Sequence, residues 1–171
     1  THMGFTARHL ASYGPPLYTV ELDPGHRLLA KRRLGARPNV TLVHGDSADA
    51  LAWIASAPRV QRPFLYLDAH SRSEPPLDAE LRITLGRWQN FALVIDDFKV
   101  PGDAAYGYWS FRGTSLALES LTLTDDVLAA FPAQPASSET GARKGAVYLG
   151  RGEGAAAISE LADSGVLTLH N

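Results

Sequence analysis

The sequence predicts an α/β fold, a Rossmann-like doubly wound sheet that is mostly parallel and ends in a C-terminal antiparallel strand pair. Apolar runs typical of strands alternate with helical patterns along most of the chain. The first four runs centre near residues 20, 42, 66 and 94, which is the spacing of repeated βα units. The third and fourth runs are nearly continuously apolar, as in strands that helices cover on both faces. A length of 171 residues suits one domain, assigned here to residues 4–171.

Composition excludes several kinds of site. The chain has no cysteine, which excludes disulfides, thiolate zinc sites and a cysteine nucleophile. Its formal charge of −2 gives no indication that nucleic acid or a membrane surface is a partner. The sequence shows no apolar run of transmembrane length and no signal peptide, so a cytoplasmic location is expected. The opening Thr1-His2-Met3 resembles an expression-vector remnant and is left out of the predicted domain.

The first two predicted strands are each followed by a capped helix. Residues 17–22 form the first strand, and Asp23 caps a helix that begins at Pro24 and ends at Gly35. Residues 40–44 form the second strand, after which Asp46 or Ser47 caps the next helix. Helical spacing in the first of these helices assigns three leucines to the core, which are Leu28, Leu29 and Leu34.

The remaining strands and helices are predicted from the same sequence signals. Residues 64–68 and 92–96 form the third and fourth strands, with a helix between them that opens at Pro75 and Pro76. A loop rich in glycine and aromatic residues spans 101–113, and a helix is expected over 114–123. Two further strands, 127–131 and 146–149, flank a polar loop, which favours a terminal antiparallel pair.

Carboxylates gather where the predicted strands end. Glu21, Asp68 and the pair Asp96-Asp97 each lie at or near a strand end, and Asp46 follows the remaining strand. Ligands of doubly wound sheets bind at the carboxyl ends of the strands. Like charges brought together repel one another, so folding favours such a group only with a cation or hydrogen-bond donors nearby. Oxygen ligands suit magnesium, calcium or manganese.

Several of these residues have a second interpretation. Glu21 is placed to accept hydrogen bonds from ribose hydroxyls, or it is a surface residue at a strand end. Asp46 and Ser47 either flank an adenine ring or only cap a helix. His70 is a metal ligand, a general base or a packed loop residue. Lys99 offers a positive charge that would remove the need for a metal ion.

Taken in order, the strand ends resemble those of class I S-adenosylmethionine (SAM)-dependent methyltransferases over roughly residues 4–150. The matching stretches are Val20-Glu21-Leu22-Asp23-Pro24, Gly45-Asp46-Ser47, Leu67-Asp68-Ala69-His70 and Ile95-Asp96-Asp97-Phe98. The likeness is greatest to bacterial metal-dependent O-methyltransferases and cephalosporin hydroxylase-like proteins. The resemblance implies metal-assisted O-methylation of a small hydroxylated acceptor, with SAM and a divalent metal, Mg²⁺, as cofactors.

The resemblance also implies roles for individual residues. The residues expected to contact SAM are Gly4, Thr6, Glu21, Asp46, Ser47 and Asp68. The residues expected to bind the metal are Asp68, Asp96 and Asp97, and the expected catalytic residues are His70 and Asp68. The expected partners are the acceptor and, if the chain self-associates as a homodimer, a second copy, without nucleic acid or membrane.

The resemblance has one departure from the family pattern. The stretch Gly4–Leu10 resembles the end of the family's glycine-rich loop, and the first strand and most of that loop are not found before it. This favours an alternative function, a non-catalytic methyltransferase-like domain that serves binding or assembly and no longer binds SAM.

Overall fold

The computed structural model describes residues 1–69 and 76–170. The chain divides into two compact units, an N-terminal unit, Thr1–Ala57, and a C-terminal unit, Pro58–Asn171. Each unit has its own strands and helices, and each is described separately below.

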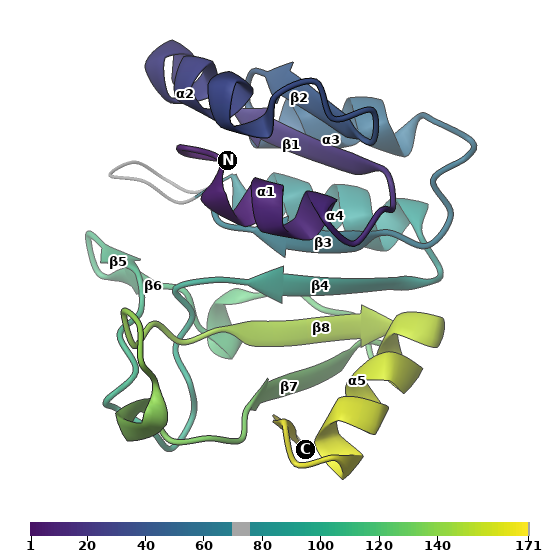
Figure 1. The fold of residues 1–171 in the computed structure, drawn as a ribbon. Coiled ribbons are helices and arrows are strands. Elements are labelled where there is room, and N and C mark those ends of the chain that lie inside the picture. Colours follow the sequence, from purple (N-terminus) through teal and green to yellow (C-terminus); the bar gives the residue numbers. More distant parts are fainter. Residues whose placement is uncertain (70–75, 171) are drawn as a thin grey trace. The chain divides into compact units, whose positions relative to one another are not determined.

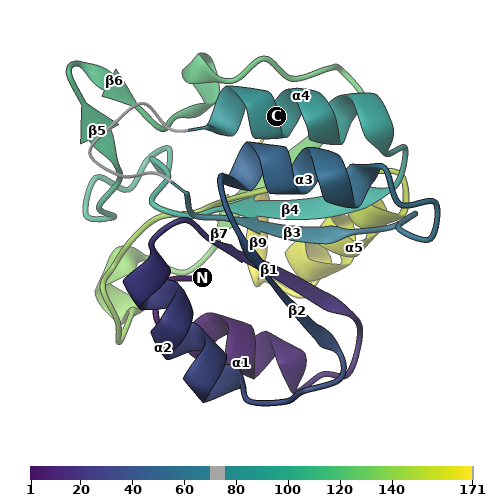
Figure 2. The ribbon, with the colours of Figure 1, turned by 90° about the horizontal axis from the view of Figure 1, so that it is seen from above.

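The N-terminal unit is built around one parallel pair of strands. Its elements are α1 (Phe5–Ala11), β1 (Leu17–Glu21), α2 (Pro24–Leu34), β2 (Val40–His44) and α3 (Ser47–Ala55). The two strands pair in parallel from Leu17↔Val40 to Glu21↔His44, so both end at one edge. Figure 2 shows α3 on the opposite face of this pair from α1 and α2.

Both predicted helix caps of this unit are confirmed. The Asp23 side chain accepts a hydrogen bond from the His26 backbone N–H at 2.7 Å, with Pro24 at the first helical position. Gly35 ends α2 with a φ of 62°, a backbone conformation that favours glycine. Asp46 caps α3 in the same way as Asp23 caps α2, and accepts from Ala48 N at 2.8 Å.

The core of the N-terminal unit is made largely of small side chains. Ala7, Ala30 and Leu34 are buried together. Leu28 and Leu29 are 50% and 41% exposed, so their assignment to the core is wrong and only that of Leu34 is confirmed. At position 30 of this helix the packing is close, because a Cβ at Gly4 would stand 3.1 Å from the Ala30 Cα.

The C-terminal unit contains a five-stranded mixed sheet. Its regular elements are β3 (Phe64–Leu67), α4 (Leu77–Arg87), β4 (Phe91–Ile95), β5 (Ser110–Phe111), β6 (Thr114–Ser115), β7 (Leu128–Pro132), β8 (Val147–Arg151), α5 (Glu153–Asp163) and β9 (Leu167–Leu169). Short 3₁₀ helices lie at Leu118–Ser120 and Ala136–Ser138. The strand order is β3-β4-β8-β7-β9. Figure 1 shows β3, β4, β8 and β7 in that sequence.

This sheet corrects the predicted topology. The fold is mixed α/β, and the antiparallel pairing of β7 with β8 agrees with the predicted C-terminal pair. The sheet as a whole is mostly antiparallel, because only β3 and β4 pair in parallel. The other parallel pair, β1 with β2, belongs to a separate two-stranded sheet. The prediction differs from the structure because β7, β8 and β9, which follow β4 in the chain, all pair antiparallel with their neighbours in this sheet.

Three parts of the C-terminal unit differ from the prediction. The helix expected over 114–123 is wrong: β5 and β6 form a hairpin there, turning at Arg112 and Gly113 with φ values of 50° and 85°. Helix α5 and strand β9 have no counterpart in the sequence prediction. Figures 1 and 2 show α5 on the opposite face of β4 from α4.

The core of the C-terminal unit lies between the sheet and these helices. Its largest fully buried apolar side chains are Trp88, Phe91, Leu93, Ile95, Phe98, Val147 and Leu149. Gly154 lets α5 lie directly on β4, because a Cβ at that position would overlap the Phe91 carbonyl oxygen at 1.7 Å. Within the described residues, no helix has both the length and the apolar character needed to cross a membrane.

Candidate functional site

The strand-end carboxylates of the C-terminal unit lie at one edge of the sheet. Asp68 follows β3, and Asp96 and Asp97 follow β4. The parallel ladder continues to this edge, since Asp96 N donates to Leu67 O at 3.0 Å. The two strands therefore end together and place three predicted metal-ligating residues at neighbouring positions.

Asp96 is held by donors from the protein itself. Its Oδ2 accepts a hydrogen bond from the Tyr66 hydroxyl, and its Oδ1 accepts from Asp97 N at 2.8 Å. Burial and this hydrogen bond raise the pKa of Tyr66, and the charges of Asp96, Asp68 and Asp97 raise that pKa further. All three carboxylates thus act on one phenol, which stays protonated as a donor.

Asp97 forms an ion pair and adopts an unusual backbone conformation. Its φ of 51° lies in the left-handed region, which few residues other than glycine, asparagine and aspartate adopt readily. Its Oδ1 lies 3.1 Å from Lys144 Nζ, and its carbonyl oxygen accepts from Trp109 N at 2.7 Å. Asp97 therefore links the end of β4 to the aromatic loop and to the segment before β8.

Tyr148 completes the group. Burial raises the pKa of its hydroxyl, and the negative charges of Asp96 and Glu139 raise it further. We refer to Tyr66, Asp68, Asp96, Asp97, Lys144 and Tyr148 as the Asp96 cluster. The arrangement can bind polar oxygen groups, because it combines protonated phenols, carboxylates and one ammonium group.

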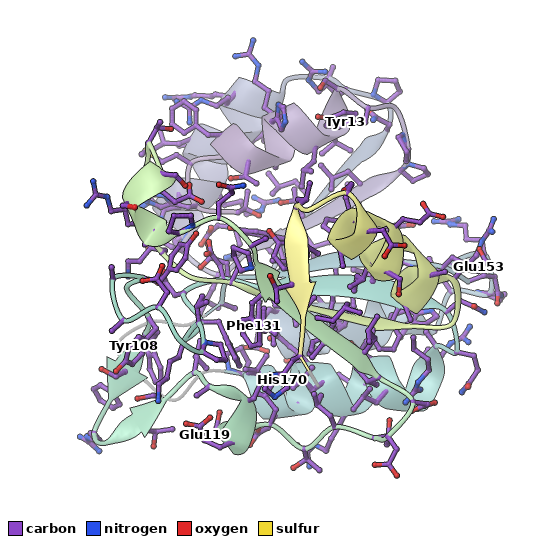
Figure 3. All side chains as sticks on the ribbon, turned by 90° about the horizontal axis from the view of Figure 1, so that it is seen from below. Tyr13, Tyr108, Glu119, Phe131, Glu153 and His170 are labelled. Carbon is purple, nitrogen blue, oxygen red and sulfur yellow. The ribbon has the colours of Figure 1, made fainter. Side chains whose placement is uncertain are left out.

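The aromatic loop, residues 101–113, has ring contacts of its own and one buried tyrosine. The Trp109 and Phe111 rings lie 6.2 Å apart, and Arg112 lies 5.1 Å from the Phe111 ring. Figure 3 shows Tyr108 near the β5–β6 hairpin, where its side chain is exposed. Tyr106 is buried instead, and its hydroxyl donates to Gln134 O at 3.0 Å. The loop is thus anchored by the buried Tyr106, whereas Tyr108 is exposed and Trp109 and Phe111 are partly buried.

In the N-terminal unit, Glu21 is occupied by nearby backbone groups. Its Oε1 accepts from Asp23 N at 2.9 Å and its Oε2 from His2 N at 2.5 Å. The Thr1 ammonium lies 3.6 Å from Oε2, and the Glu21 side chain is 11% exposed. Thr1 and His2, which resemble part of an expression-vector remnant, therefore contact the Glu21 carboxylate that was expected to bind ribose.

Asp46 and Ser47 differ in whether their side-chain oxygens have hydrogen-bond partners among the described residues. Asp46 Oδ1 serves as the cap of α3. Ser47 Oγ is buried and has no hydrogen-bond partner within residues 1–69 and 76–170. Such a hydroxyl is destabilising unless a ligand or water supplies its partner. Arg27 Nε is likewise buried without a hydrogen-bond partner among the described residues, so Ser47 is one of two residues of this unit whose polar atoms could take a bound ligand.

The other predicted cofactor residues have mainly structural surroundings. Gly4 has a φ of 80° and precedes α1, and its N–H donates to Thr1 O at 2.9 Å. Thr6 is exposed in the first turn of α1. His70 lies outside the described residues, so the structure gives no position for this predicted base.

Two of the carboxylates expected to bind a metal have protein partners, so the divalent metal stays a prediction. In the described part of the chain, no three His, Asp or Glu side chains are grouped to hold a metal ion. Both oxygens of Asp96 accept from Tyr66 and Asp97, and Asp97 Oδ1 pairs with Lys144. Lys99, which the sequence offered as a positive charge for the carboxylates, forms an ion pair with Glu119 instead, with Nζ 3.5 Å from Oε1. The lysine that pairs with Asp97 is Lys144.

Three members of the cluster were missed by sequence reasoning. Tyr66 had a detectable signal, because it lies two residues before Asp68 and strand residues two apart share a face. Tyr148 lies in β8 and Lys144 in the segment before it, and the antiparallel pairing of β4 with β8 brings them to the end of β4. Their position depends on long-range pairing that the local sequence does not encode.

Comparison with known proteins adds no family to these observations. No protein-family model matches the chain, and no curated protein matches it.

Proposed function

We propose that this chain is a SAM-dependent methyltransferase domain that methylates a hydroxyl group of a small acceptor. The observation that carries the proposal is the buried Ser47 Oγ, which has no hydrogen-bond partner among the described residues. It follows the parallel strand β2, and Glu21 ends the adjacent strand β1 at the same edge. A carboxylate and a hydroxyl at that edge suit the ribose and adenine of a nucleoside cofactor.

Each unit has its own role in this proposal. SAM supplies an electrophilic methyl group when bound. Glu21 accepts hydrogen bonds from the ribose hydroxyls, and Asp46 and Ser47 contact the adenine. The C-terminal unit, taken by itself, holds the Asp96 cluster, whose polar groups suit a hydroxylated molecule, and Asp68 or His70 is the residue that we propose to accept a hydroxyl proton.

The test is calorimetric binding of SAM and S-adenosylhomocysteine to the chain and to a variant that begins at Gly4. We expect the shorter variant to bind at least several-fold more tightly, because Glu21 no longer accepts from His2. Within that variant, Ser47→Ala should weaken binding about tenfold, the effect of losing one hydrogen bond to a buried ligand. Asp49→Ala, at an exposed position of the same helix, is the control. Failure of both folded chains to bind either nucleoside rules out the proposed function.

A second function has its own supporting observation. Glu21 already accepts two backbone hydrogen bonds, as expected if the domain no longer binds SAM and serves binding or assembly. Persistent absence of nucleoside binding in the variant that begins at Gly4 would favour this alternative, since Glu21 is then no longer held by His2.

The proposal also covers the detailed fold class and the cellular location of the protein. The two parallel pairs, each made of successive βα units, support a Rossmann-like doubly wound arrangement. The absence of cysteine is compatible with the proposed cytoplasmic location.

A further inference from the structure

The last residues of β1 contact the first residue of the chain through several polar groups. The Thr1 ammonium donates to Val20 O at 3.0 Å and lies 3.6 Å from Glu21 Oε2. The Thr1 hydroxyl donates to Val20 O at 2.5 Å and lies 2.5 Å from Thr19 Oγ1. A carbonyl, a carboxylate and a hydroxyl from successive strand residues therefore surround one ammonium group and its neighbouring hydroxyl.

The carbonyl at the centre of this arrangement belongs to an open strand edge. Gly45 N donates to Glu21 O at 3.2 Å, so the backbone groups of Glu21 face β2. Backbone groups of successive strand residues point to alternate sides, so Val20 O faces the other edge of β1. Among residues 1–69 and 76–170, the strand that pairs with β1 is β2. Val20 O therefore takes its donors from Thr1 and not from a neighbouring strand.

The surroundings of Thr1 favour a positive charge. The Thr1 side chain is fully buried, the Glu21 side chain is 11% exposed and Thr19 is 8% exposed. An ammonium group removed from water is stable only beside an opposite charge and with acceptors for its N–H groups. Glu21 supplies the charge and Val20 O supplies an acceptor. A neutral group in the same place would leave the Glu21 carboxylate without a positive partner there.

The Glu21 carboxylate is held in place by a second contact that does not involve Thr1. Its Oε1 accepts a hydrogen bond from Asp23 N at 2.9 Å, whereas Oε2 is the oxygen that faces the ammonium. The other two polar groups are also fixed, since Val20 O belongs to the strand backbone and Thr19 is buried. A site whose groups are already oriented loses little entropy when it binds.

We infer that the end of β1 is a binding site for a primary ammonium group with a hydroxyl on the adjacent carbon atom. Thr1 presents this arrangement, because its ammonium is on Cα and its hydroxyl on Cβ. Glu21 selects the positive charge, Val20 O accepts from both groups, and Thr19 Oγ1 contacts the hydroxyl. A small amino alcohol and the N-terminal serine or threonine of another peptide share this chemistry.

The inference goes beyond the proposed function and does not depend on methyl transfer. The residues that form the site lie in the predicted domain, whereas Thr1, its occupant, resembles part of a vector remnant. Glu21 is also the carboxylate that the proposed function assigns to ribose, so an amine and a nucleoside would exclude each other there. Amine binding is measured without nucleoside, so its failure and the failure of the proposed function are separate results.

The first experiment uses the full chain and periodate, which cleaves the bond between carbon atoms that carry an adjacent amine and hydroxyl. Mass spectrometry should show cleavage at Thr1 at least tenfold slower than in the free peptide Thr-His-Met-Gly, because cleavage requires Thr1 to leave the site. Glu21→Gln and Thr19→Val should each raise the rate about fivefold, the effect of losing one polar contact. Asp49→Asn and Thr41→Val are the matched controls at exposed positions of the same unit and should cleave as wild type does.

The second experiment measures threoninamide binding by calorimetry to the chain that begins at Gly4. We expect binding at least tenfold tighter than to the full chain, in which Thr1 competes from within the molecule. N-acetylthreoninamide, which has no ammonium group, should not bind. Thr-His-Met-Gly distinguishes the two sources of the ligand: tighter binding than threoninamide indicates a peptide N-terminus, and equal binding indicates a small amino alcohol.

Three results would overturn the inference. Periodate cleaves Thr1 of the wild type as fast as the free peptide, or Glu21→Gln leaves the cleavage rate unchanged. The third is that the chain beginning at Gly4, folded by circular dichroism, binds neither threoninamide nor Thr-His-Met-Gly. If the shorter chain does not fold, the periodate rates of the full-length variants still decide whether these residues hold the amine.

Discussion

Gly145 lies against the backbone of Phe98 so closely that a Cβ at position 145 would stand 2.2 Å from the Phe98 carbonyl oxygen. The same two residues share a hydrogen bond from Phe98 N to Gly145 O at 2.8 Å. This contact joins the segment that carries Lys144 to the segment that follows Asp97. Any side chain at position 145 must therefore move one segment away from the other.

The first prediction is that Gly145→Ala lowers the free energy of unfolding by about 2–3 kcal/mol, the range for overpacking against immobile atoms. Urea unfolding followed by circular dichroism measures the change. Gly141→Ala is the control, because a Cβ at that exposed glycine would meet no atom within 4 Å. The control should stay within about 0.5 kcal/mol of wild type. Equal effects of the two substitutions would show that the close approach is absent.

The second prediction concerns Arg151, which is buried at the end of β8. The Arg151 Nη1 donates hydrogen bonds to Leu85 O at 2.9 Å and to Trp88 O at 3.3 Å. The Arg151 Nε lies 2.9 Å from Asp126 Oδ2, and this contact is an ion pair that lacks the geometry of a hydrogen bond. Arg151→Met removes the donors from two carbonyl groups at the end of α4. We expect a loss of about 2–3 kcal/mol in the free energy of unfolding.

Arg62→Met is the comparison for Arg151, because Arg62 also forms an ion pair, with Glu153 at 2.7 Å, but both side chains are largely exposed. Exposed pairs contribute little, so the Tm of this variant should stay close to that of wild type. Thermal unfolding of the two variants side by side checks this. A larger effect at Arg62 than at Arg151 would contradict the structural assignment.

The third prediction is a pH dependence at the cap of α2. The hydrogen bond from the His26 backbone N–H lowers the pKa of Asp23 below its ordinary value of 3.8. A carboxyl group with a lowered folded-state pKa stabilises the fold above its unfolded pKa, and this contribution is lost as the pH falls through the folded pKa. Wild type should therefore lose stability between about pH 5 and pH 2 relative to Asp23→Asn.

Asp23→Asn serves as the reference because asparagine caps helices as well as aspartate and does not titrate. The measurement is the difference in Tm between the two proteins across this pH range. A constant difference would show that the Asp23 cap contributes no pH dependence.

The fourth prediction concerns the outer edge of β3. In the described part of the chain, β3 has β4 as its strand partner on one side only, and Phe64 is 59% exposed. Unprotected edge strands pair with other chains, and a lysine on the edge prevents this. Phe64→Lys should therefore reduce concentration-dependent self-association in analytical ultracentrifugation. Tyr13→Lys replaces an exposed aromatic residue outside any strand and should leave self-association unchanged.

The local signals of the N-terminal unit were sufficient to predict its elements. Asp23, Pro24 and Gly35 mark both ends of α2 through side-chain and backbone preferences that act within a few residues. The core positions of that helix were not predictable in the same way. Leucine spacing assigned Leu28 and Leu29 to the core, whereas the closest contact uses Gly4 and Ala30, which hydrophobicity does not distinguish.

In the C-terminal unit, prediction failed where tertiary pairing decides the structure. The stretch after Gly113 has helical composition, but the turn at Arg112 and Gly113 directs it back to pair with Ser110 and Phe111. Helix α5 had a detectable signal in its alanine-rich stretch and in Ile158, which packs into the core. The strand-end carboxylates were visible in the sequence, whereas their partners Lys144 and Tyr148 depend on the register of β4 against β8.

The position of β4 in the sheet has a consequence for synthesis of the chain. One partner, β3, precedes β4 in the sequence, but the other, β8, begins only at residue 147, about fifty residues after β4 ends. At ordinary translation rates that interval lasts roughly 3–10 s, during which one side of an apolar strand has no partner. The register of Phe91 against Arg151 is therefore decided late. A ribosome that stalls before residue 147 would hold a nascent chain suited to recognition by chaperones.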